Sequence, residues 1–340
     1  MTRKRCLPRR VADMATNATP FPPLPVAKKS DGTDRLCGVE IEFAGPTEDQ
    51  TAERIVQDFG GTISSDGQHG VTIKNTVFGD IFVELDITLR KRDDVPFLNE
   101  GLDLFRGLIP VEVVTAPLDR RQMAEFNAVC RSLRDIGAMG SRKGVLHGFG
   151  VHLNPDVVAP DDRHTFETIR AYGFLEPWLR AREGVDPTRR MMPFVGAWPN
   201  AFVSQLATTT FTDVPALMHL AADYIKSRNQ SLDLLPLFKH AEPALFSKLF
   251  AETDKTSARP TFHFRLPDSR IDEPDWSLLQ PWQLWRQVEL VAANAPLMQD
   301  LAVGWSDHDA AWFERKSVWV DTVDHLLDTH DVKVEQCPAP

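Results

Sequence analysis

The segment Gly38-Val39-Glu40-Ile41-Glu42-Phe43 alternates apolar and acidic side chains. Side chains on a β-strand point to opposite faces of the sheet with a period of two. The apolar side chains of this segment would therefore share one face, and Glu40 and Glu42 would share the other. The pattern predicts a strand that buries one face in the core and presents two carboxylates on the opposite face.

Four further segments repeat this alternation, at residues 82–87, 111–115, 149–154 and 262–266. The polar positions of these segments carry carboxylates, imidazoles and a guanidinium, which are Glu84, Asp86, Glu112, His152, His263 and Arg265. If the five strands share one sheet, one of its faces forms a cation site with an anion-binding arginine beside it.

The composition of the 340-residue chain is typical of a globular protein, with 42% hydrophobic and 25% charged residues. A formal net charge of −10 argues against general affinity for nucleic acid. No run of about 18 apolar residues predicts a transmembrane helix, and no secretory signal is predicted. The four cysteines lack C-x-x-C spacing, which favours reduced thiols and a cytoplasmic location.

Helix start and stop signals divide the first half of the chain. The segment Thr47-Glu48-Asp49-Gln50 is typical of a capping box, and the helix that follows is expected to end at Gly60. Residues 61–87 are expected to form β-hairpins. Asp119 is expected to cap a second helix that ends at Gly137. This order predicts an α+β fold with helices on one face of the sheet.

The second half of the chain is expected to be mostly helical. Candidate helices lie at residues 166–179, 216–225 and 243–250, and one long helix is expected at 278–301. If the Arg265 strand pairs with the early strands, residues 31–330 form a single domain with a helical insertion at about 160–258. Residues 1–30 are expected to be a disordered leader, and residues 331–340 a C-terminal tail.

Each candidate site residue also has a purely structural interpretation. Acidic strand faces are often simply solvated, Glu112 could form a salt bridge with an arginine, His152 could be a hydrogen-bonded core histidine, and Arg265 could be a counter-charge. Adjacent carboxylates on one face repel each other, however, and a divalent cation such as Mg²⁺ or Mn²⁺ removes that penalty.

The chain contains neither G-x-x-x-x-G-K-[ST] nor a G-x-G-x-x-G after a strand. Any nucleotide would therefore be bound by metal and by basic side chains on the sheet.

The motifs and their order resemble the amidoligase family of the carboxylate–amine ligase superfamily, which includes glutamine synthetase and glutamate–cysteine ligase. The matching residues are Gly38, Glu40 and Glu42 for G-x-E-x-E; Glu112, Val114, Thr115, Pro117 and Leu118 for E-[LV]-V-[ST]-x-P-L; Gly148, Val151 and His152 for G-x-H-V-H; and, less closely, Asp86 with Thr88 and Phe264 with Arg265. Two positions depart from the family pattern: Gly150 replaces a histidine, and His263 replaces a glutamate.

The resemblance implies a glutamine-synthetase-like antiparallel sheet, with helices packed on one face and the active site on the other. It also implies an ATP-dependent ligase that joins a carboxylate to an amine through an acyl-phosphate. The expected substrates are an amino acid or peptide with a free carboxylate, and an amine.

The resemblance also implies roles for individual side chains. The expected ligands of Mg²⁺ or Mn²⁺ are Glu40, Glu42, Glu112 and His152. Both His152 and Arg265 would contact ATP, and Arg265 would stabilise the transferred phosphoryl group. Asp86 would orient or deprotonate the amine.

Two alternatives remain at this point. The same carboxylates and histidine could activate water in a metal-dependent hydrolase. Alternatively, the departures at Gly150 and His263 could mark a catalytically impaired relative that binds a nucleotide or peptide.

Overall fold

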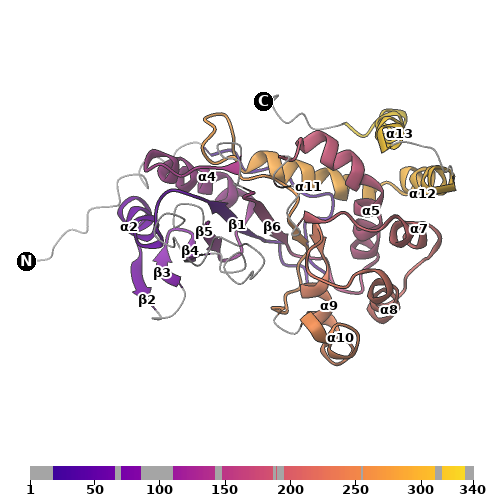
Figure 1. Cartoon of the computed structure of the whole chain (residues 1–340), viewed down its shortest axis with the longest axis horizontal. Coiled ribbons are helices and arrows are strands. Elements are labelled where there is room, and N and C mark those ends of the chain that lie inside the picture. The colour runs from indigo at the N-terminus through magenta and orange to yellow at the C-terminus, as the bar shows by residue number, and fades with distance from the viewer. Residues whose placement is uncertain are drawn as a thin grey trace, which may run out of the picture.

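The computed structural model describes residues 18–65, 70–85, 110–141, 148–186, 189, 195–253, 256–310 and 316–333. Within these residues, an open eight-stranded antiparallel sheet and ten α-helices form a mixed α/β architecture (Figure 1). The strands are β1 (Cys37–Phe43), β2 (Thr62–Ser65), β3 (Gly70–Thr76), β4 (Gly79–Leu85), β5 (Val111–Thr115), β6 (Val151–Pro155), β7 (Leu232–Asp233) and β8 (His263–Phe264), in the spatial order β2-β3-β4-β5-β1-β6-β8-β7.

The predicted strand alternation is confirmed. On β1, the apolar side chains of Val39, Ile41 and Phe43 are fully buried in the core. The paired strands β5 and β6 bury Val113 and Val151 on the same face, because the register aligns both of them with Ile41. One face of the sheet therefore belongs to the core, and the opposite face, here called the polar face, carries the acidic and basic side chains.

Helices cover the core face of the sheet (Figure 1). Helix α2 (Glu48–Phe59) packs on β3 and β4 and against α4 (Arg120–Asp135), while α11 (Leu279–Ala292) packs on β6. The predicted caps are confirmed, since Thr47 and Asp119 each form a complete capping box with the glutamine three residues later. These caps fix where the two helices begin, and hence how they lie across the sheet.

The chain between β6 and β8 contains most of the remaining helices. These are α5 (Arg163–Glu183), α7 (Asn200–Thr208), α8 (Val214–Tyr224), α9 (Leu235–Ala241) and α10 (Pro243–Leu249), followed by the short 3₁₀ helix η4 (Ala251–Thr253). The two-residue strand β7 lies within this segment and pairs with β8 at the edge of the sheet. The segment therefore contributes to the sheet as well as packing beside it.

The prediction of one long helix at residues 278–301 is wrong. The chain forms two helices instead, α11 and α12 (Ala295–Ala310), and α13 (Lys316–Thr329) follows. Asn294 lies at the break and accepts a hydrogen bond from the backbone N–H of Leu297 through its side chain (3.1 Å). Pro296 lacks a backbone N–H, so it fits the first turn of a helix but interrupts a helix interior.

Ordered packing begins before residue 30, where the predicted leader was expected to end. Phe21 and Leu24 are buried in the core, and the indole of Trp282 donates a hydrogen bond to the carbonyl of Pro22 (2.9 Å). Residues 1–17 of the predicted leader and residues 334–340 of the predicted tail lie outside the described residues.

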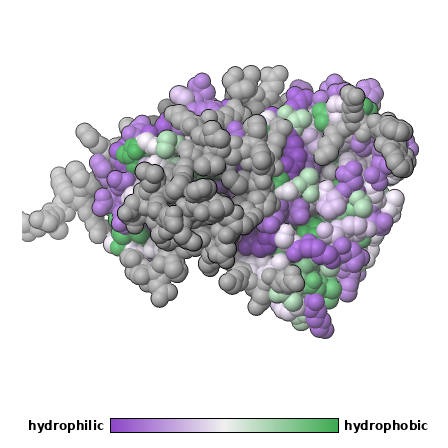
Figure 2. Space-filling model, in the orientation of Figure 1, coloured by the Kyte–Doolittle hydropathy of each residue, from purple (hydrophilic) through white to green (hydrophobic). Residues whose placement is uncertain are grey.

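The described surface is mostly hydrophilic on the side shown in Figure 2, with small hydrophobic patches between the polar residues. Among the described residues, no helix is both long and apolar enough to span a membrane. Cys37 and Cys130 are buried free thiols, as the cysteine spacing predicts.

Candidate functional site

The strand register gathers the acidic residues at the centre of the polar face. Glu40 on β1 lies opposite His152 on β6, and Glu42 lies opposite Glu112 on β5. Glu112 in turn lies opposite Glu84 on β4. Because neighbouring strands are only about 4.8 Å apart, these register positions place four carboxylates and an imidazole within one small region.

His152 lies among three of these carboxylates. Its Nδ1 atom is 3.0 Å from Oε2 of Glu40 and 3.9 Å from Oε1 of Glu112, and its Nε2 atom is 3.4 Å from Oε1 of Glu42. The predicted site residues Glu40, Glu42, Glu112 and His152 are therefore brought together, although they come from three strands.

Burial controls the protonation of this cluster. Removal from water lowers the pKa of His152 from 6.5 to about 3, although its hydrogen bond to Glu40 opposes the shift. Burial alone would raise the pKa of Glu40, but its hydrogen bond with His152 and the close approach of His263 hold it well below its usual value. A neutral imidazole beside an ionised carboxylate follows, and such an imidazole keeps one ring nitrogen with a lone pair.

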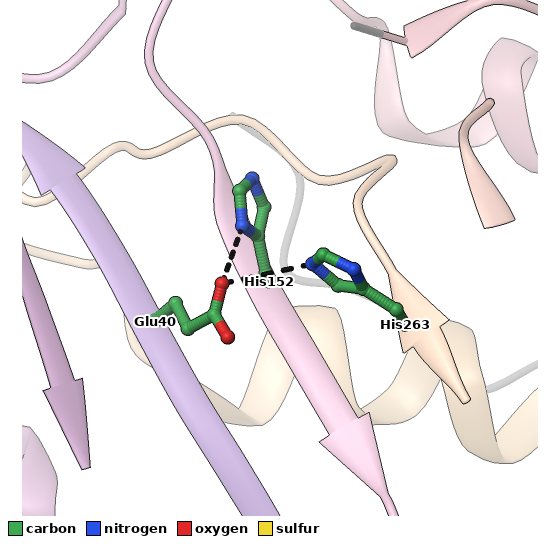
Figure 3. A group of neighbouring side chains, drawn as sticks. All are labelled: Glu40, His152 and His263. Atoms are coloured by element: carbon green, nitrogen blue, oxygen red, sulfur yellow. Dashed lines mark hydrogen bonds and ion pairs between the residues drawn. The ribbon is translucent and has the colours of Figure 1, made fainter. Parts of the chain in front are cut away.

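The two oxygens of Glu40 face different groups. Oε1 accepts hydrogen bonds from the side chains of Asn154 (2.9 Å) and Arg259 (3.3 Å). Oε2 faces the two histidines, His152 at 3.0 Å and His263 at 3.6 Å. The carboxylate is thus held in one orientation, with a single oxygen directed between the imidazoles (Figure 3).

A cavity of about 280 Å³ opens over this part of the polar face. Its lining includes Glu40, Glu84 and Glu112 on the acidic side and Arg228 and Arg259 on the basic side. The Arg259 side chain is 47% exposed, so its guanidinium is accessible from solvent. A site with carboxylates on one side and guanidinium groups on the other can bind a cation and an anion next to each other.

The other predicted site residues are placed less directly. Arg265 follows β8 and lies close enough to His152 for its charge to contribute to the low pKa of that histidine. Its guanidinium donates a hydrogen bond to the carbonyl of Arg228 (2.7 Å), and its Nε atom has no hydrogen-bond partner in the described part of the chain. Asp86, the proposed amine-binding residue, lies outside the described residues.

The glycine at position 150 is explained by a neighbour that the sequence did not indicate. A Cβ atom at Gly150 would collide with the guanidinium of Arg189 and would lie 3.1 Å from Nε2 of His152. Arg189 is buried and donates hydrogen bonds to the carbonyls of Leu266 (2.5 Å) and Arg265 (2.5 Å). A fixed positive charge therefore occupies the space that a larger side chain would fill.

Several site residues were not predicted from the sequence. Asn154 has the same strand parity as His152, so the alternation could have identified it. Arg228, Asp233 and Arg259 lie in irregular segments or in a two-residue strand, where no periodicity marks which side chains face the site.

Two groups of side chains have the spacing of a cation site. The first is Glu42, Glu112 and His152, and the second is Glu40, His152 and His263. Within each group, one ligand atom from every residue lies within 4.8 Å of the others. The two groups share His152, so this imidazole stands between an oxygen-rich position and a nitrogen-rich position.

A family model described as "Putative amidoligase enzyme" matches residues 33–287, which is well over half of the chain and includes all the residues of both groups. A search of curated proteins finds no match.

Proposed function

The chain belongs to the amidoligase family, and from this premise we propose that it is an ATP-dependent ligase that forms an amide from a carboxylate and an amine. The family supports a ligase-type enzyme. The observation that carries the finer proposal is the convergence of Glu40, Glu42, Glu112 and His152 beside an arginine-lined cavity.

The donor set fits a magnesium ion. Glu42 and Glu112 offer hard carboxylate oxygens, which Mg²⁺ prefers, and His152 lies between them and Glu40. Clustered carboxylates also repel one another unless a cation neutralises them. When bound, Mg²⁺ would neutralise the charge on the ATP phosphates.

The proposed reaction has two steps. An oxygen of the substrate carboxylate attacks the γ-phosphorus of ATP, the bond to the β-phosphate oxygen breaks, and ADP leaves with that electron pair. The amine nitrogen then attacks the acyl carbon, and inorganic phosphate leaves as the carbon–oxygen bond breaks. The amine gives up a proton to a base, the role proposed for Asp86.

The arginines would bind and stabilise the negatively charged groups in both steps. Arg265 lies beside His152 and would stabilise the phosphoryl group during transfer. Arg228 and Arg259 line the cavity and would hold the substrate carboxylate or the phosphates. The 3.3 Å approach of Arg259 to Glu40 supports a role for this arginine in binding an anion beside the proposed cation ligands.

The test is release of ADP and phosphate from MgATP in the presence of candidate amino acids, peptides and amines. Glu112→Gln removes a proposed metal ligand and should reduce turnover by at least ~100-fold, the scale of losing one electrostatic group from an active site. Glu125→Gln, on α4 and paired with Arg121 at 3.5 Å, is the matched control. Wild-type turnover in Glu112→Gln would show that the metal assignment is wrong.

A second candidate is favoured by the contact between Arg189 and Gly150. The guanidinium occupies the place where the family pattern has a histidine, so the chain could retain nucleotide binding without catalysis. Saturable MgATP binding in calorimetry, without turnover for any carboxylate and amine pair, would favour this candidate over the ligase. ATP-independent turnover of an amide would instead favour a metal-dependent hydrolase.

A further inference from the structure

We propose that Glu40, His152 and His263 form a second site for a divalent cation that prefers imidazole ligands, such as Zn²⁺. The site adjoins the oxygen-rich Glu42–Glu112 position and shares His152 with it. This inference goes beyond the proposed ligase function and does not depend on it, because it concerns metal binding without nucleotide.

The spacing of the three ligand atoms suits a tetrahedral cation. Ligands held at about 2.1 Å from such a cation lie about 3.4 Å from one another. Oε2 of Glu40 lies 3.0 Å from Nδ1 of His152 and 3.6 Å from Nε2 of His263. The three side chains converge from β1, β6 and β8, as Figure 3 shows. A tetrahedral cation held by these three atoms would have its fourth position available for a water molecule or substrate.

The Nε2 atom of His263 makes no hydrogen bond in the described part of the chain. Its side chain is only 9% exposed, and Nε2 approaches Oε2 of Glu40 only to 3.6 Å, which is beyond hydrogen-bond distance. A buried polar atom without a partner costs about 1–3 kcal/mol. A cation between Nε2 and Glu40 would remove this cost.

The outer ring nitrogen of His263 lies near two groups that favour opposite tautomers. Nδ1 is 3.5 Å from Oδ2 of Asp233, which can only accept a hydrogen bond, and 3.4 Å from Nη2 of Arg228, which can only donate one. A cation at Nε2 requires the lone pair there and a proton on Nδ1, so it selects the tautomer that faces Asp233. Carboxylates commonly orient metal-binding histidines in this way.

Asp233 is well suited to this supporting role. Its side chain is 1% exposed, and it accepts hydrogen bonds from Nε of Arg228 (2.8 Å) and the backbone N–H of Leu235 (3.0 Å). These hydrogen bonds fix Asp233 in position behind His263.

The types of ligand atom indicate which metal this site prefers. Two imidazole nitrogens and one carboxylate oxygen are typical ligands of zinc, whereas Mg²⁺ prefers oxygen ligands in an octahedral arrangement. A glutamate at position 263, as in the family pattern, would make the same position oxygen-rich. The histidine at this position is thus expected to change the preferred cation.

The experiment measures metal binding by calorimetry on metal-free full-length protein, without nucleotide. Zn²⁺ should bind wild type, and His263→Gln should weaken Zn²⁺ binding by at least the ~10- to 100-fold that loss of an outer-shell partner causes. Mg²⁺ binding should be the same in both proteins. His263→Glu should shift the preference from Zn²⁺ toward Mg²⁺. His330→Gln is the matched control, because His330 also faces a carboxylate, Asp300 at 2.7 Å, on a different part of the molecule.

A second readout needs no substitution and guards against misfolded variants. In wild-type protein with ¹⁵N-labelled histidine, Zn²⁺ should shift the ring-nitrogen resonances of two histidines. Absence of Zn²⁺ binding, shifts that match no pair of imidazoles, or unchanged Zn²⁺ affinity in folded His263→Gln would overturn the proposal. Loss of ligase activity with Zn²⁺ binding intact would count only against the proposed function.

Discussion

The guanidinium of Arg189 occupies the space above Gly150 that any larger side chain would need. Arg189 is held there by two backbone carbonyls and by an ion pair with Asp268 at 3.2 Å, with both side chains at most 2% exposed. The glycine and the arginine therefore form one unit, although they are far apart in the sequence.

Gly150→Ala is expected to destabilise the protein, because the added methyl group collides with the Arg189 guanidinium and with the edge of His152. Overpacking of this kind typically costs about 1–3 kcal/mol in the free energy of unfolding, which denaturant titration can measure. Gly304→Ala in α12 is the control, since its methyl group meets Trp319 at an ordinary 3.4 Å. In an Arg189→Ala background the cost of Gly150→Ala should shrink, and an unchanged cost would contradict the steric explanation.

Stability is expected to fall as the pH is lowered from 6.5 toward 3, partly through His152. This imidazole has a pKa of about 3 in the folded protein against 6.5 as its ordinary value. The unfolded chain therefore binds more protons over this interval, and the free energy of unfolding falls by up to about 1.4 kcal/mol per pH unit from this group alone. The folded His152→Gln variant should show a flatter dependence in the same titration, and an identical slope would argue against a neutral buried imidazole.

The buried pair Arg35–Glu289 is expected to be essential for stability. The two side chains are 1% and 0% exposed, and two hydrogen bonds of 2.6 and 2.7 Å join them. Removing Arg35 leaves the buried carboxylate of Glu289 without its guanidinium partner. Among the described residues, that carboxylate then contacts only His164 (3.2 Å) and the indole of Trp285 (2.8 Å). Arg35→Met should therefore lower the free energy of unfolding by about 3–5 kcal/mol. Glu125→Gln on the surface should change it by less than ~1 kcal/mol. The double variant Arg35→Met with Glu289→Leu should recover part of the loss.

The thiols of Cys37 and Cys130 are expected to resist alkylation in the native state. Both are buried, and burial raises the pKa of Cys130 to about 12 and shifts that of Cys37 upward as well. Because the thiolate is the reactive form, iodoacetamide should modify these two residues only after unfolding. Mass spectrometry of the peptides that contain each cysteine would measure this, and rapid modification under native conditions would show that the sites open locally.

The sequence predicts the polar face well because period-two alternation reports directly which side chains share a face. Glu40, Glu42, Glu112 and His152 were identified in this way. Alternation does not report which strands are neighbours, however, so the contact between Glu40 and His263 appears only in the assembled sheet.

The residues missed from the sequence share a physical reason. Arg259 reaches the site from a segment without regular structure, and Asp233 lies in a strand of two residues, which is too short for a periodic signal. The broken helix at Asn294 is different, because Pro296 and the capping asparagine were visible signals that the apolar periodicity outweighed.

The order of the strands along the chain determines when each part of the site can form during synthesis. Glu40, Glu42, Glu112 and His152 are all synthesised before α5, whereas Arg259, His263 and Arg265 follow the whole helical segment. Joining β8 to β6 closes a long loop, and contacts of this kind form slowly because their entropic cost comes first. During synthesis, the carboxylates of the early strands therefore exist without the basic groups that later balance them. We therefore expect the cleft to be completed late in folding, when β8 joins β6 and brings His263 and the neighbouring Arg265 to the acidic strands.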